Sequence, residues 1–262
     1  MSRGVGCLVG LQEVKMRIAI GNISDKLKKD EFSTVVRAIS RQVHEDFAPL
    51  WGMTATLRHA TIARNAKPDP ELNNADVIIY VGETNDDPQK VERAVGYHSR
   101  NHQGIPYGFV FTDVAEKVHE QWSTTLSHEV LELIADPDVN LMVVGPNPAN
   151  PNGAVLRPYE VCDPVQADTY EIDDVIVSNF VTPLYFAQLA HPVLTQTNYM
   201  NLTLPRFGVR PGGYFSYYDL GAQKWNDVFG QGTAERYAPR RAAMFNEARR
   251  MFRHHGKQLP VK

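Results

Sequence analysis

The stretch Ser127-His128-Glu129-Val130-Leu131-Glu132-Leu133-Ile134-Ala135-Asp136-Pro137 has the pattern of a helix end that carries reactive groups. Apolar residues recur at helical spacing from Val118 to Ile134, and Pro137 disfavours helical geometry at the residue before it. His128 and Glu132 are four residues apart, so on a helix their side chains point the same way, one turn apart. The sequence therefore predicts a helix that presents an imidazole and a carboxylate together near its end.

This His-Glu-x-x-Glu pattern indicates a divalent metal site. An imidazole and a carboxylate at that spacing can hold one ion, with Glu129 beside them to take a proton from metal-bound water. The better-known motif has a second histidine where this chain has Glu132. We expect zinc as the ion, with manganese or calcium as alternatives, because oxygen ligands shift preference toward harder ions.

A catalytic zinc site needs at least three protein ligands, so a third must come from elsewhere in the chain. Glu160 is the better candidate, and Asp163, one turn further on, would then support the distal nitrogen of His128. The two roles could equally be exchanged. Asp136 is on nearly the same helix face but about 12 Å further along the axis, so we expect it to organise the turn before Pro137 rather than to act as an alternative ligand.

The rest of the chain predicts an α+β fold. Four runs are expected to be strands: 16–22, 54–59, 76–82 and 107–111. Helical segments are expected at 30–49, 91–98 and 234–255, a loop at 145–153, and hairpins at 169–181 and 213–229. We therefore expect one zincin-like domain over residues 16–232, a mixed sheet with a metal-site helix. A disordered leader (1–15) would precede it and a basic amphipathic helix (233–262) would follow.

The helix Ser127–Pro137 and the segment Tyr159–Pro164 together resemble a family of bacterial and phage proteins of zincin-like, metallopeptidase-like character. Its members pair an S-H-E-x-x-E-x-x-x-D-P helix with a downstream E-x-x-D segment. Gly96-Tyr97-His98, residues 104–110 and residues 211–214 are similar to further stretches of that family. The resemblance covers roughly residues 76–220. It implies a zincin-like fold and a peptidase-like, metal-dependent hydrolase.

Three further residues have a structural explanation beside a functional one. His98 and Tyr107 could contact substrate, although residues of these types more often fill a loop or a core. The strand 107–111 would line the cleft and could pair with an extended peptide. Cys162 falls inside the motif and could be a ligand, but a buried structural thiol is the commoner outcome.

Composition limits the partners. Net charge is −3, with 43% hydrophobic and 22% charged residues, which argues against nucleic acid or membrane as the main partner. The hint of nucleic-acid binding is the tail 233–262, which holds eight Lys/Arg and two Glu. Two cysteines form no disulfide framework. The apolar run Val5 to Leu11 lacks the length and cleavage pattern of a signal peptide, and no run of about 18 apolar residues exists, which favours a cytoplasmic or virion-associated protein.

Two hypotheses follow. In the first, the protein is a peptidase-like metallohydrolase: His128, Glu132 and Glu160 hold the ion, and Glu129 acts as general base on a peptide or protein substrate. In the second, the same metal-binding fold is a non-catalytic structural or assembly module, for example in a phage. The sequence leaves the oligomeric state open.

Overall fold

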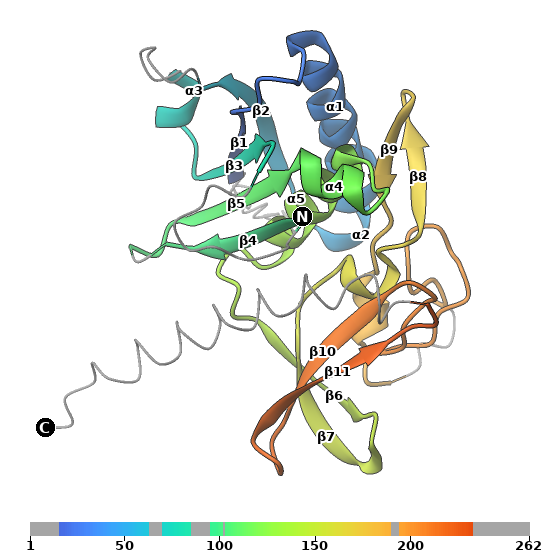
Figure 1. Ribbon diagram of the computed structural model, residues 1–262. Helices are drawn as coiled ribbons and strands as arrows, with labels where there is room; N and C mark the ends of the chain where they lie inside the picture. Colours follow the sequence, from blue (N-terminus) through green and yellow to red (C-terminus); the bar gives the residue numbers. More distant parts are fainter. Residues whose placement is uncertain (1–15, 63–69, 85–94, 102, 190–193, 233–262) are drawn as a thin grey trace, which may run out of the picture.

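The computed structural model describes residues 16–62, 70–84, 95–101, 103–189 and 194–232. A five-stranded sheet forms the N-terminal half of this structure (Figure 1). Its strands, in the spatial order β2-β1-β3-β5-β4, are β2 (Ala55–Thr61), β1 (Met16–Asn22), β3 (Val77–Gly82), β5 (Pro106–Phe111) and β4 (Gly96–Arg100). The first four are mutually parallel, and β4 runs antiparallel to β5. The α+β class and the four predicted strands are confirmed.

The predicted helix at 30–49 is also present, in three continuous parts: α1 (Lys29–Arg41), a π-helical turn η1 (Gln42–Phe47) and α2 (Ala48–Trp51). Gly52 ends it in the left-handed conformation, with φ of 67°, which glycine adopts without strain. Short helices α3 (Pro70–Asn73) and α4 (Thr112–Lys117) follow β2 and β5. The helix predicted to begin at Val118 begins at Trp122, because the chain turns at His119, whose φ is 58°.

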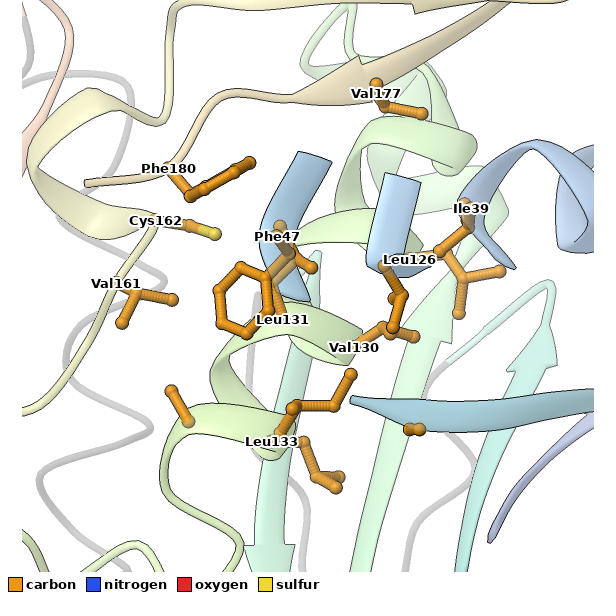
Figure 2. Close-up of a cluster of buried hydrophobic side chains, with 14 of the residues drawn as sticks. Ile39, Phe47, Leu126, Val130, Leu131, Leu133, Val161, Cys162, Val177 and Phe180 are labelled. Carbon is orange, nitrogen blue, oxygen red and sulfur yellow. The ribbon is translucent and has the colours of Figure 1, made fainter. Parts of the chain in front are cut away.

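The helix α5 (Trp122–Ala135) lies at the centre of the fold. One side packs on β4 and β5, and another packs on the hairpin strand β9 (Val175–Ser178). Leu126, Val130 and Leu133 are fully buried in one continuous core with residues of α1 and of the sheet (Figure 2). All residues from Ser123 to Ala135 are buried, the polar ones included, so the polar side chains of this helix must find partners inside the protein.

A second sheet lies on the C-terminal side. Its order is β11-β10-β7-β6, with β6 (Met142–Asn147), β7 (Asn150–Pro158), β10 (Tyr214–Asp219) and β11 (Lys224–Phe229). The hairpin predicted at 213–229 is present. The one at 169–181 is present as β8 (Thr169–Ile172) and β9, and both turn residues, Asp173 and Asp174, have positive φ, as a two-residue type I′ turn requires.

Two predictions of secondary structure are wrong. Residues 145–153, predicted as a loop from their Pro, Asn and Gly content, lie in the β6–β7 hairpin. Pro146 fits there because β6 is an edge strand of its sheet, where a missing N–H costs little. The segment predicted as helical at 91–98 contributes its last residues to β4, where antiparallel pairing with β5 overrides the helical spacing. The leader 1–15 and the basic tail 233–262 lie outside the described residues.

Candidate metal centre

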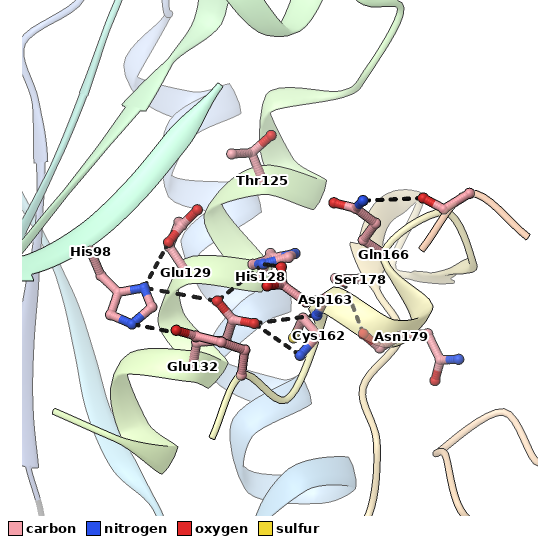
Figure 3. Close-up of polar contacts among 12 residues, drawn as sticks. His98, Thr125, His128, Glu129, Glu132, Cys162, Asp163, Gln166, Ser178 and Asn179 are labelled. Atoms are coloured by element: carbon pink, nitrogen blue, oxygen red, sulfur yellow. Dashed lines mark hydrogen bonds and ion pairs between the residues drawn. The ribbon is translucent and has the colours of Figure 1, made fainter. Parts of the chain in front are cut away.

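Imidazole and carboxylate side chains from three separate parts of the chain converge beside the C-terminal half of α5 (Figure 3). Helix α5 supplies His128, Glu129 and Glu132, strand β4 supplies His98, and the segment after β7 supplies Glu160 and Asp163. The side chains of these residues are at most 5% exposed, except that of Glu160, which is 16% exposed. Buried charges at this density require compensation by a bound ion or by protons.

His128 Nε2 lies between two carboxylates. It is 3.1 Å from Glu132 Oε2, as helical i,i+4 spacing predicts, and 3.2 Å from Asp163 Oδ1. Glu160, predicted as the third ligand of this pair, instead has its Oε2 3.8 Å from His98 Nε2. Of the two alternatives that the sequence leaves open, this geometry places Asp163 beside His128 and Glu160 on the far side of His98.

Glu132 is oriented by the backbone. Its Oε1 accepts hydrogen bonds from the N–H groups of Cys162, at 3.0 Å, and Asp163, at 3.3 Å. Its Oε2 is buried, has no hydrogen-bond partner, and faces both imidazoles. Backbone donors thus hold Oε1 and leave Oε2 directed at the imidazoles, an orientation that suits a metal-ligating carboxylate.

The register of the sheet brings His98 into the centre. Gly96 and His98 alternate with Tyr97 along β4, so these two residues face α5. A Cβ atom on Gly96 would lie 2.6 Å from Thr125 Cγ2 and 3.1 Å from Glu129 Oε1, so glycine allows the close approach of strand and helix. As a result His98 Nδ1 donates a hydrogen bond of 2.9 Å to Glu129 Oε2 and lies 3.8 Å from Glu132 Oε2.

Burial and mutual charge shift the pKa values of the cluster in opposite directions. Burial works to raise the pKa of Glu132, but His128 and His98 outweigh it and lower the pKa to about 2. Burial also works against protonation of His98, yet hydrogen bonding and charge from Glu129 raise its pKa. Burial, followed by the charges of Glu132 and Asp163, raises the pKa of Glu160 well above 4.5. Glu132 and Glu160, two carboxyl groups of the same cluster, therefore have opposite protonation tendencies.

The donor set fits a divalent ion. Bonds of about 2.0–2.2 Å to tetrahedral zinc place neighbouring ligand atoms roughly 3.3–3.6 Å apart. The separations of 3.1 and 3.2 Å from His128 Nε2 are close to that spacing. Cys162 is a further candidate ligand, since its sulfur and atoms of His128 and Glu132 lie within 4.8 Å of one another. Burial keeps the pKa of its thiol well above the ordinary value, however, which disfavours the thiolate that a metal binds. The cofactor expectation is thus met at the level of a possible metal site.

Two residues considered from the sequence lie away from these contacts. Asp136 ends α5, and its Oδ2 accepts a hydrogen bond of 2.8 Å from the N–H of Leu141, so it organises the turn, as expected. Tyr107 is paired with Ser99, so its side chain lies on the face of the sheet opposite to His98 and packs on Tyr97, with ring centroids 6.3 Å apart. That placement contradicts a substrate contact by Tyr107 beside the histidines.

A buried polar network holds the other side of α5. Ser127 Oγ donates to Gln42 Oε1 at 2.7 Å and accepts from the N–H of Ser178 at 3.0 Å. Gln42 Nε2 in turn donates to the carbonyl of Ser178 at 2.8 Å. These contacts join α5 to the π-helical turn and to β9, which fixes the rotation of the helix and hence the direction of His128. The sequence analysis missed this network, for which the buried π-turn leaves no local pattern.

Comparison with known proteins finds no matching family model, no matching curated protein and no matching solved structure. The resemblance to zincin-like proteins therefore stays a prediction. No helix in the described ranges is both long and apolar enough to cross a bilayer.

Proposed function

We propose that the protein is a metal-dependent hydrolase whose ion is held by His128, Glu132 and Asp163. The observation that carries the proposal is Glu132 Oε2, a buried carboxylate oxygen without a hydrogen-bond partner that faces two imidazoles. The two imidazoles supply positive charge on the side of Oε2, and a divalent cation would bind that oxygen directly. Bound there, a divalent ion would supply Lewis acidity and lower the pKa of a coordinated water.

Glu129 is the proposed general base. It is adjacent in sequence to His128, and its Oε2 is held by His98 Nδ1 at 2.9 Å, so its orientation is fixed before substrate arrives. The raised pKa of His98 favours its protonated form, which places a positive charge beside the carboxylate of Glu129. Helix α5 thus supplies the base, Glu129, and strand β4 supplies the residue that orients it, His98.

A peptide-like substrate is proposed, with β4 as the strand that it meets. The sequence predicts strand 107–111 for this role. That strand is β5, which pairs with β3 on one side and β4 on the other, so neither of its sides is free to pair with a peptide. Within the described ranges β4 has a strand partner on one side only. An extended peptide can add to such an edge through main-chain hydrogen bonds. A mixed sheet whose edge strand lies beside the metal-site helix also supports the zincin-like fold.

The test is peptide cleavage by purified protein loaded with zinc or manganese, followed by mass spectrometry of a peptide library. We expect cleavage by the parent chain, loss of about 10²-fold or more in Glu129→Gln, and no change in Glu171→Gln, a matched substitution on the exposed side of β8. Metal binding without cleavage in any variant would refute the enzyme proposal and leave the non-catalytic assembly module as the explanation.

A further inference from the structure

The centre contains more negative charge than one divalent ion neutralises. Glu129, Glu132 and Asp163 are each at most 5% exposed, and Glu160 lies against His98. One ion of charge +2 balances two of these four carboxylates. Leaving the rest ionised in a buried site is costly unless they are paired or protonated. The other two carboxyl groups, those of Glu129 and Glu160, both lie against His98, at 2.9 and 3.8 Å, and not beside His128.

We propose that the centre binds two divalent ions, bridged by Glu132. The first ion is that of the proposed function, on which this inference rests, and the second is held by His98 Nδ1, Glu129 Oε2 and Glu132 Oε2. These three residues form a buried group whose ligand atoms all lie within 4.8 Å of one another. Glu132 belongs equally to the group containing His128.

The geometry of Glu132 favours a single-oxygen bridge. Because the N–H groups of Cys162 and Asp163 hold Oε1, only Oε2 is available to ions. That oxygen lies 3.1 Å from His128 Nε2 on one side and 3.8 Å from His98 Nδ1 on the other. Both distances are near the roughly 3.3–3.6 Å between ligands of one ion, and paired catalytic ions lie about 3.5–4 Å apart.

Binding of the second ion would replace an existing proton. The ion takes the place of the hydrogen that now joins His98 Nδ1 to Glu129 Oε2, which are 2.9 Å apart and would separate by about 0.5 Å. His98 would keep its Nε2 proton, directed at Glu160 Oε2 3.8 Å away. One imidazole and two carboxylates form an oxygen-rich set that suits manganese as well as zinc.

The second ion changes the role of Glu129. In a one-ion centre Glu129 is a base and contributes nothing to the number of ions bound. In a two-ion centre it is a ligand, and its loss removes an ion. Two ions would then supply binding sites for the attacking water and for the carbonyl oxygen of a peptide-like substrate. The number of ions in Glu129→Gln therefore distinguishes the two roles without any activity measurement.

The experiment measures bound manganese per chain by equilibrium dialysis and metal analysis, with electron paramagnetic resonance of the loaded protein. We expect two ions in the parent chain and a broadened signal from coupled ions. We expect one ion and an uncoupled signal in both His98→Gln and Glu129→Gln. His59→Gln, an exposed histidine on β2, and the surface variant Glu171→Gln should keep two.

Each other outcome has a definite meaning. One ion in the parent chain overturns the two-ion centre and leaves the proposed function standing, whereas no ion overturns both. Two ions retained in both His98→Gln and Glu129→Gln also overturn the inference, because the second ion would then have other ligands. Circular dichroism of the two variants against the parent chain confirms that a lost ion reflects a lost ligand and not a lost fold.

Discussion

Replacing either of two neighbouring glutamates with glutamine should change the stability of the metal-free protein in opposite directions. The amide of Glu132→Gln can still accept the two backbone hydrogen bonds at Oε1, so the substitution mainly removes charge. Glu160→Gln makes the same chemical change on the other side of His98. The pair therefore isolates the effect of environment on a buried carboxylate.

The magnitude for Glu132 follows from its pKa. The folded state lowers that pKa from 4.5 to about 2, which corresponds to about 3 kcal/mol of stability. This contribution is fully present above pH 4.5 and is lost as the pH falls toward 2. At pH 7, Glu132→Gln should therefore lower the free energy of unfolding by about 3 kcal/mol, or roughly 6–12 °C in Tm.

Ionisation of Glu160 has the opposite effect on folding stability, because the pKa of Glu160 is raised in the folded state. Its contribution is present below pH 4.5 and is lost as the pH rises toward its folded pKa, so the ionised group opposes folding at neutral pH. Glu160→Gln should leave stability unchanged below pH 4.5 and increase it at pH 7.

The assay is urea unfolding in the presence of EDTA, at pH 7 and at pH 4, with the parent chain and Glu171→Gln as references. Chelation is essential, because both glutamates lie among candidate metal contacts and a bound ion would favour their charged forms. Equal destabilisation by both substitutions at pH 7 would refute the electrostatic reasoning. So would a stabilising effect of Glu132→Gln.

Three further outcomes are expected. Zinc at about 100 times its Kd should raise the free energy of unfolding by about 2.7 kcal/mol, or Tm by roughly 5–11 °C in calorimetry. EDTA should reverse this increase, and an unchanged Tm would count against a preformed site. Gly96→Ala should cost about 1–3 kcal/mol in urea unfolding, because its Cβ would meet Thr125 Cγ2 at 2.6 Å, and Thr125→Ser in the same chain should recover part of it; no recovery would contradict that contact. Asp174→Gly should stabilise the β8–β9 turn by roughly 0.5 kcal/mol, because φ there is 63°; a loss of stability would argue against the type I′ turn.

Local patterns in the sequence predicted most of the elements near the centre. The apolar runs at β1, β3 and β5, the helical spacing of α1 and the position of Pro137 all have local physical causes, namely burial and backbone sterics. The same reasoning failed at 145–153, where Pro, Asn and Gly occur within an edge hairpin. It also failed at β4, because antiparallel pairing with β5 depends on a partner that no local window contains.

The candidate site was predictable only in part. His128 and Glu132 meet because helical spacing alone requires it, and their 3.1 Å contact agrees with that expectation. The sequence predicts only a minor role for His98, since its place beside Glu129 depends on sheet register and on the missing side chain of Gly96. The exchange of Glu160 and Asp163 likewise depends on how the chain bends after β7. The spacing of residues along the sequence does not predict long-range contacts of this kind.

The central claim is that a divalent ion binds beside Glu132 Oε2. Anomalous diffraction at the zinc edge from crystals grown with zinc tests it most directly. We expect a strong anomalous peak about 2.0–2.2 Å from both His128 Nε2 and Glu132 Oε2. Crystals whose zinc peaks all lie elsewhere, with His128 and Glu132 still 3.1 Å apart and no peak between them, would contradict it.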